Sequence, residues 1–228
     1  MRSAPTDAEL SQFRRRILKW FALNGRSFPW RSPRAGTYVR VVSEILLQRT
    51  QATRIAAFIP KFVSIYPSWK QLAKSTRRDL RRLLEPLGLW RRRADALQAL
   101  ARAIHRQHGR LPGTPFKILN LPGVGQYIGN AILLFAHGVP SPLLDVNMAR
   151  VLERNFGPRK LVDIRYDPYL QSLASRVIVS DKPREVNWAI LDLAAIVCTP
   201  RNPKCFQCPL ISTCKFSKAR RKAERRET

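Results

Sequence analysis

The chain carries a tight glycine turn, Leu121-Pro122-Gly123-Val124-Gly125, between two stretches of helical sequence. The backbone must reverse there through positions that a side chain would obstruct. The apolar run from Ile128 to Phe135 follows at once and predicts a new helix. The amides of Gly123 and Gly125 would then point outward at a helix N-terminus, where the dipole and unpaired N–H groups favour an anion such as a backbone phosphate. The alternative is a helix–turn–helix corner whose glycines serve packing alone.

The rest of the chain also predicts helices. Apolar residues recur at helical spacing in many segments, whereas no sustained alternation of apolar and polar residues predicts a strand. We therefore expect an all-α fold. The expected helices cover residues 8–23, 38–47, 55–65, 69–73, 77–84, 94–105, 170–179 and 185–197, and residues 1–7 are expected to be a disordered lead in which Thr6 or Asp7 caps the first helix.

The charge of the chain indicates a polyanionic partner. Its 42 lysines and arginines outnumber 15 acidic residues and leave a net charge of +27, which a merely solvated surface explains poorly. Nucleic acid is favoured over a membrane, because no stretch is apolar for the length that a bilayer needs and the basic residues are spread over the whole chain. The N-terminus lacks the hydrophobic segment of a secretory signal, so we expect an intracellular, cytoplasmic protein that associates with the nucleoid.

A carboxylate lies inside the nearly all-apolar run from Tyr38 to Leu47. Glu44 either faces water or sits desolvated with a raised pKa, and the second arrangement suits a general acid. The polar residues 48–51, Gln-Arg-Thr-Gln, follow directly. They suit base edges and phosphates, but they suit water equally.

A second carboxylate, Asp145, directly precedes a helical segment that runs to about Phe156. In that position it can cap the orphan amides of the first turn, and as a cap alone it would have no catalytic meaning.

All four cysteines of the chain lie close together near its C-terminal end, in the spacing C-x6-C-x2-C-x5-C. In a reducing compartment this indicates a metal site rather than two disulfides. Both zinc and a four-iron, four-sulfur cluster can use four cysteines, but zinc sites more often pair two C-x2-C knuckles and this segment has one. The candidate ligands are Cys198, Cys205, Cys208 and Cys214.

The segment from Lys215 to Thr228 is very basic and poor in apolar residues. We expect it to be a disordered tail that adds electrostatic affinity for DNA.

Three of these motifs together resemble the helix-hairpin-helix DNA glycosylase superfamily. Residues 121–125 look like its hairpin, Leu144-Asp145-Val146-Asn147 looks like its aspartate motif, and the cysteine spacing is similar to that of the iron–sulfur loop in its endonuclease III branch. The likeness runs from about Phe13 to Cys214. It implies a six-helix domain over residues 28–138, with the helix-hairpin-helix, and a second domain that joins residues 1–27 to 139–228 and carries a 4Fe–4S cluster. The active site would lie between them.

The resemblance also implies catalytic roles. Asp145 would stabilise positive charge as the N-glycosidic bond breaks, and Glu44 would handle protons or position water. Tyr127 stands where bifunctional members carry the lysine that attacks the sugar, and no lysine occurs between Lys117 and Lys160. We therefore expect a monofunctional glycosylase without efficient AP lyase activity.

The same resemblance implies which residues contact double-stranded DNA. The hairpin would hold a phosphate through its backbone amides, and residues after the Glu44 helix would insert into the gap left by a flipped nucleotide. The residues assigned to DNA binding are Gly123, Val124, Gly125, Gln48, Arg49 and Gln51.

The base that is removed is expected to be thymine or uracil opposite guanine. Phe28-Pro29-Trp30-Arg31, Ser43-Glu44-Ile45-Leu46-Leu47 and the length resemble the compact thymine/uracil mismatch glycosylases, whereas Val146 matches no branch. Adenine glycosylases resemble the chain at Glu44, Gln51 and Tyr127, but they differ at residues 88–92 and carry a further domain after the cysteines. Adenine removal is the alternative, and a non-catalytic DNA-binding module on the same scaffold is the third possibility. We expect a monomer.

Overall fold

The computed structural model describes residues 4–224, and within that range every regular element is a helix. The predicted all-α class is therefore confirmed for the described residues. The chain forms two compact units: Ser27–Val139 is one, and the segment up to Arg26 together with the chain from Pro140 onward is the other. These boundaries lie within one residue of those expected.

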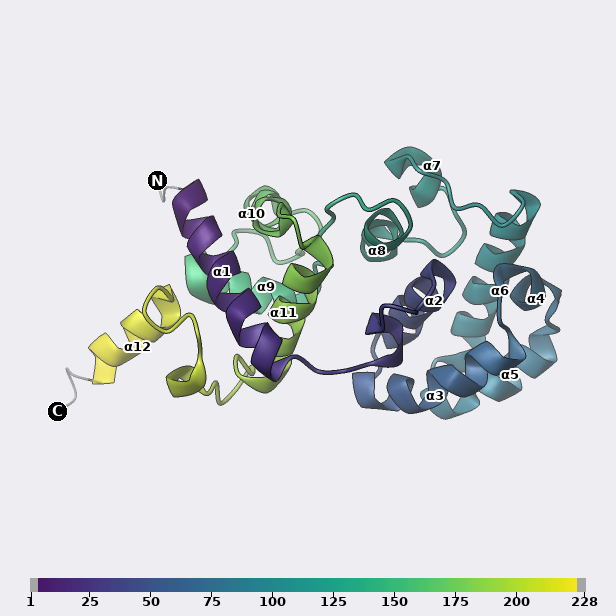
Figure 1. Ribbon diagram of the computed structural model, residues 1–228, viewed down its shortest axis with the longest axis horizontal. Coiled ribbons are helices and arrows are strands. Elements are labelled where there is room, and N and C mark those ends of the chain that lie inside the picture. Colours follow the sequence, from purple (N-terminus) through teal and green to yellow (C-terminus); the bar gives the residue numbers. More distant parts are fainter. Residues whose placement is uncertain (1–3, 225–228) are drawn as a thin grey trace. The chain divides into compact units, whose positions relative to one another are not determined.

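The unit Ser27–Val139 holds seven α-helices, one more than the six that the resemblance implies (Figure 1). The helix that the sequence did not predict is the five-residue α7, which begins at a proline, Pro115. The α-helices are α2 (Thr37–Leu47), α3 (Ala52–Ile65), α4 (Trp69–Lys74), α5 (Arg77–Leu84), α6 (Trp90–Arg106), α7 (Pro115–Leu119) and α8 (Gln126–Ala136), and two 3-10 turns, η1 (Pro29–Arg31) and η2 (Glu85–Leu87), accompany them.

The core of this unit is built around α2. Val41, Val42 and Leu46 are fully buried, and α2 packs against both α3 and α8. On the other side of the unit, α4 and α5 pack on the long helix α6. Because α2 is buried on most sides, its polar residues Ser43 and Glu44 are drawn into the interior as well.

The other unit contains α1 (Asp7–Asn24), α9 (Val146–Phe156), α10 (Pro168–Ile178), α11 (Pro183–Ile196), the 3-10 turn η3 (Cys205–Gln207) and α12 (Lys215–Glu224). α11 packs against both α1 and α9, although α1 is distant from both in sequence. An ion pair of 2.7 Å between Arg26 and the fully buried carboxylate of Asp192 ties the chain just after α1 to α11.

Two sequence expectations about the chain ends are wrong where the structure describes them. The lead is ordered over residues 4–7, because Pro5 is buried and Thr6 caps α1 in a reciprocal capping box with Glu9. The basic tail begins as helix α12, because Ser217 is buried and the Lys215 ammonium donates to the Phe156 carbonyl at 2.8 Å. Residues 1–3 and 225–228 lie outside the described range.

None of the helices between residues 4 and 224 combines the length and the apolar character that crossing a bilayer requires.

Candidate functional site

The glycine turn lies between α7 and α8 and has the conformation that its sequence predicts. Gly123 has a φ of +72°, and a Cβ there would stand 3.1 Å from the Cβ of Ala96. Gly125 is the N-cap of α8, and nothing lies within 4 Å of where its Cβ would be. Within the described part of the chain, the N–H groups of both glycines donate to no acceptor. The turn therefore presents two amide donors at a helix N-terminus, which suits a phosphate oxygen.

Val124 does not fit the DNA-binding role that the resemblance assigns to it. Its side chain is 8% exposed and belongs to the hydrophobic core, and its N–H donates to the Leu121 carbonyl at 3.2 Å. Both the side chain and the amide are thus used within the protein, and Val124 packs the turn rather than contacting a ligand.

Glu44 is buried, so the alternative in which it faces water is wrong. Its side chain lies on α2 with 2% exposure. The Tyr127 hydroxyl, on α8, donates to Glu44 Oε2 at 2.8 Å, which joins two residues 83 positions apart. A half-buried phenol thus holds a buried carboxyl group in one orientation.

Asp145 is the N-cap of α9, and its carboxylate is held by three donors. Oδ1 accepts the backbone N–H groups of Asn147 and Met148 at 2.9 and 2.8 Å. Oδ2 accepts the side-chain amide of Asn147 at 2.7 Å. The cap predicted from the sequence is confirmed, and it also fixes the orientation of a half-buried carboxylate at the N-terminus of α9.

A second layer of hydrogen bonds links Asp145 to the cysteine segment. Arg150 donates to the Asn147 side-chain oxygen at 3.2 Å and to the Cys198 carbonyl at 2.8 Å. Burial lowers the pKa of the Arg150 guanidinium, and the neighbouring Cys198 thiol and Asp145 carboxylate oppose that effect. The sequence indicated Asn147 only as part of the aspartate motif, without a role, and Arg150 was missed because nothing in the sequence distinguishes it from the other basic residues.

Cys205 begins η3 and Cys208 directly follows it, and all four cysteines are half-buried. Burial raises the pKa of the Cys208 thiol to about 12, and Cys198, Cys214 and Cys205 add to the rise, so the four sulfurs influence one another electrostatically. Among the described residues, however, no group of three or more His, Cys, Asp or Glu side chains is arranged to hold a metal ion.

The surroundings of the sulfurs nevertheless suit thiolates. Backbone N–H groups of Leu210 and of Phe216 and Ser217 hydrogen-bond the thiols of Cys208 and Cys214, respectively, and lower their pKa values against the effect of burial. The Arg154 guanidinium donates to Cys198 Sγ at 3.4 Å. Backbone N–H groups and a guanidinium are donors that stabilise a thiolate.

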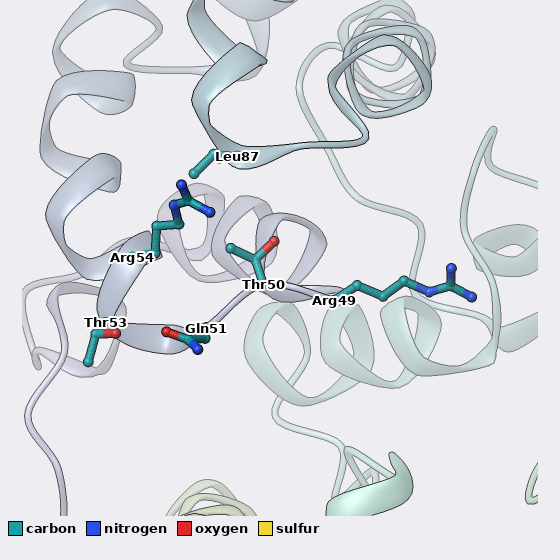
Figure 2. A pocket seen from close by; sticks show the side chains of 6 residues that line it. All are labelled: Arg49, Thr50, Gln51, Thr53, Arg54 and Leu87. Atoms are coloured by element: carbon teal, nitrogen blue, oxygen red, sulfur yellow. The ribbon is translucent and has the colours of Figure 1, made fainter.

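Residues 48–51 form an exposed loop between α2 and α3. Gln48, Arg49 and Gln51 are all exposed, and Arg49 has a left-handed backbone with a φ of 56°. The loop borders an open depression of about 480 Å³, in which Figure 2 shows Arg54 directed toward Leu87 while Arg49 extends to the other side. The depression is lined by Arg49, Thr50, Gln51, Thr53, Arg54 and Leu87.

The predicted site residues therefore fall into groups within each unit. Ser27–Val139 contains the paired Glu44 and Tyr127, the glycine turn that precedes Tyr127, and the 48–51 loop. The other unit contains Asp145 and, through Arg150, the cysteine segment.

The chain is similar to known DNA repair proteins over most of its length. It is 38% identical to a thymine-DNA glycosylase from Aeropyrum pernix, and the match covers 90% of this chain and 94% of that protein. It is 34% identical to a thymine/uracil-DNA glycosylase from Methanothermobacter thermautotrophicus, and that match covers 88% of this chain and 90% of the relative. The solved structure of a thermostable thymine-DNA glycosylase matches with a TM-score of 0.85 at 32% identity, covering 93% of this chain and 98% of that one. The adenine DNA glycosylase of Homo sapiens is 30% identical over 96% of this chain and 41% of its own length.

A family model described as the HhH-GPD superfamily base excision DNA repair protein matches residues 42–164, a range that holds Glu44, the glycine turn, Tyr127 and Asp145. With relatives this similar and a match over more than half of its length, the chain belongs to the HhH-GPD superfamily of base excision DNA repair proteins.

Proposed function

We propose that the protein is a monofunctional DNA glycosylase that hydrolyses the N-glycosidic bond of thymine or uracil opposite guanine in double-stranded DNA. The observation that carries the proposal is the Asp145 carboxylate, which three donors hold at the N-terminus of α9 in a chain 38% identical to a thymine-DNA glycosylase. We expect it to act as a monomer on the DNA of the nucleoid.

The chemistry requires a fixed negative charge beside the sugar. As the base leaves, the deoxyribose acquires oxocarbenium character, and an oriented carboxylate stabilises that charge without reorganising. Asp145 meets this need because both of its oxygens already accept hydrogen bonds and the side chain cannot rotate freely.

Glu44 and Tyr127 supply the proton chemistry in this proposal. A carboxyl group buried at 2% exposure and held by a phenol can exchange a proton with the departing base or orient the attacking water. Their hydrogen bond keeps both groups in one arrangement, which an acid or a water-positioning group needs.

The proposal excludes efficient strand cleavage by the enzyme. A β-elimination through a Schiff base needs an amine nucleophile. Tyr127 offers a phenol that is already hydrogen-bonded to Glu44, and no lysine lies between Lys117 and Lys160.

DNA would be held by the amides of Gly123 and Gly125 and by the exposed 48–51 loop. The two amides can bind one backbone phosphate without reading the base, which positions the duplex, while Gln48 and Arg49 enter the gap left by the flipped nucleotide.

We further propose that Cys198, Cys205, Cys208 and Cys214 hold a 4Fe–4S cluster. The mutual electrostatic influence of the thiols and the backbone N–H groups that point at them support this assignment. A bound cluster would have a structural role, since it would cross-link the loop that follows α11 to the start of α12.

Duplexes that carry G·T, G·U, or adenine opposite oxidised guanine, each labelled on the strand to be processed, test the proposal. Incubation followed by alkali should cleave the G·T and G·U duplexes, and omission of alkali should leave the strands intact. Borohydride should trap no covalent protein–DNA adduct. Cleavage of the adenine duplex alone would indicate an adenine glycosylase, and salt-sensitive binding without cleavage of any duplex would indicate a binding module; either result contradicts the proposal.

A further inference from the structure

A buried arginine joins two loops of the Ser27–Val139 unit. Arg93, in the first turn of α6, is 7% exposed. Its guanidinium donates to the Leu87 carbonyl at 3.1 Å, to the Thr50 hydroxyl at 2.6 Å, and to the Gln48 carbonyl. Its acceptors thus come from the loop after α2 and from η2, which are about forty residues apart in the chain.

A strained residue lies in the loop after α2, and another lies between η2 and α6, at the N-cap of α6. Arg49 and Leu89 have φ values of 56° and 51°, a left-handed backbone conformation that residues other than glycine rarely adopt. Arg49 directly follows one carbonyl that Arg93 binds, and Leu89 lies two residues beyond the other. Such strain persists only where the surroundings hold it.

The strained residues also present their side chains to solvent. Arg49 is exposed, and Leu89 is 52% exposed although it is a large apolar residue. The depression shown in Figure 2 lies between the two loops, because Leu87 forms one wall and residues 49–51 form another. The guanidinium of Arg93 therefore bridges these two walls through the Leu87 carbonyl and the Thr50 hydroxyl.

We propose that Arg93 is a positioning residue for nucleotide extrusion: its guanidinium locks the 48–50 and 87–89 loops, so that Arg49 and Leu89 form a preformed edge which enters the base stack as the target nucleotide leaves. This inference rests on the proposed glycosylase function.

Three observations support this role over simple stabilisation. No carboxylate pairs with Arg93 among the described residues, so a desolvated cation, whose pKa burial lowers, is compensated by neutral oxygens alone. The planar fork of donors on a guanidinium fixes several acceptors at once, which an apolar side chain of similar length cannot do. Those acceptors lie next to the two strained residues.

The test compares wild type with Arg93→Met on a G·U duplex that carries 2-aminopurine beside the uracil. The fluorescence of 2-aminopurine rises when its neighbour leaves the stack. We expect Arg93→Met to bind the duplex with nearly unchanged affinity and to slow both extrusion and single-turnover excision by roughly 10- to 100-fold. A duplex whose uracil lies in a short mismatched loop needs less unstacking, and most of the loss should be recovered on it.

Two controls separate positioning from other causes. Arg92→Met removes the same charge from an exposed site on α6 and should leave extrusion unchanged. Asp145→Asn should extrude the nucleotide normally while losing excision. Should Arg93→Met fail to fold, Thr50→Val can replace it, because this variant removes one acceptor and leaves Arg93 in place. It should slow extrusion and excision on the intact duplex in the same way, but by a smaller factor.

The inference would be overturned if Arg93→Met, or Thr50→Val where Arg93→Met does not fold, extruded the nucleotide at the wild-type rate. An equal loss of excision on the intact and the mismatched-loop duplexes would overturn it as well. Absence of excision by wild type on both duplexes would instead contradict the proposed function.

Discussion

At the scale of single residues, one side chain serves both the fold and the proposed chemistry. Asp145 caps α9 by accepting the N–H groups of Asn147 and Met148, which have no partner within the helix. The same hydrogen bonds orient its carboxylate. Arg150 extends this hydrogen-bond network, because it donates both to the Asn147 side chain and to the Cys198 carbonyl. A role in capping therefore does not argue against a role in catalysis.

Asp145→Asn should separate the two roles. Asparagine caps helices about as well as aspartate, so thermal unfolding should change little, but the loss of negative charge should lower single-turnover excision by roughly 100-fold or more. DNA affinity measured by gel shift should be unchanged or higher, because one repulsion from the phosphates is removed. Excision at the wild-type rate would remove Asp145 from the mechanism.

At the scale of elements, helix caps organise the irregular chain between α9 and α10. Asp167 is fully buried at the N-cap of α10. Its Oδ1 accepts the N–H of Leu170 at 2.7 Å, and its Oδ2 accepts those of Lys160 and Leu161 at 2.8 and 2.9 Å. Burial by itself would raise the pKa of Asp167, but these backbone hydrogen bonds outweigh it, so that the pKa lies below its ordinary value.

The lowered pKa predicts a dependence of stability on acid. The contribution of Asp167 is complete above the pKa of an unfolded aspartate, about 3.9, and is lost as the pH falls through the lower pKa of the folded state. Asp167→Asn should reduce the free energy of unfolding at pH 7 by about 1–3 kcal/mol and should flatten its decline below about pH 5. Urea unfolding at a series of pH values measures both effects. The exposed Asp181→Asn variant is the control, and equal behaviour of the two variants would contradict the prediction.

At the scale of the whole molecule, two features are not properties of any single helix: the net charge of +27 and the cysteine segment. The charge predicts DNA binding that weakens steeply with salt. The segment from Cys198 to Cys214 connects α11 to α12, so a group bound there would join distant parts of one unit.

The cluster assignment predicts a visible property of the purified protein. The protein should be brown, with broad charge-transfer absorbance and about four irons per chain. Cys208→Ser should lower the iron content and the absorbance, whereas Ser212→Ala, an exposed position in the same loop, should keep both. A colourless protein with one zinc per chain would refute the assignment.

Local features of the fold were predictable from the sequence, and long-range ones were not. Thr6 and Asp145 are caps where the sequence predicts them, because a cap depends on a few neighbouring residues. Helix α12 was missed because its composition indicates disorder, and the buried Ser217 and the bond from Lys215 to Phe156 that hold it involve distant partners.

The sequence by itself determined the helical class, the glycine turn, the acidic candidates and the cysteine set, since periodicity, residue type and spacing are properties of short segments. Only the tertiary structure decided that Glu44 is buried and bonded to Tyr127, that Val124 belongs to the core, and that Arg93 joins two strained loops. Each of these depends on packing between residues that lie far apart in the chain, and local sequence preference carries no information about such contacts.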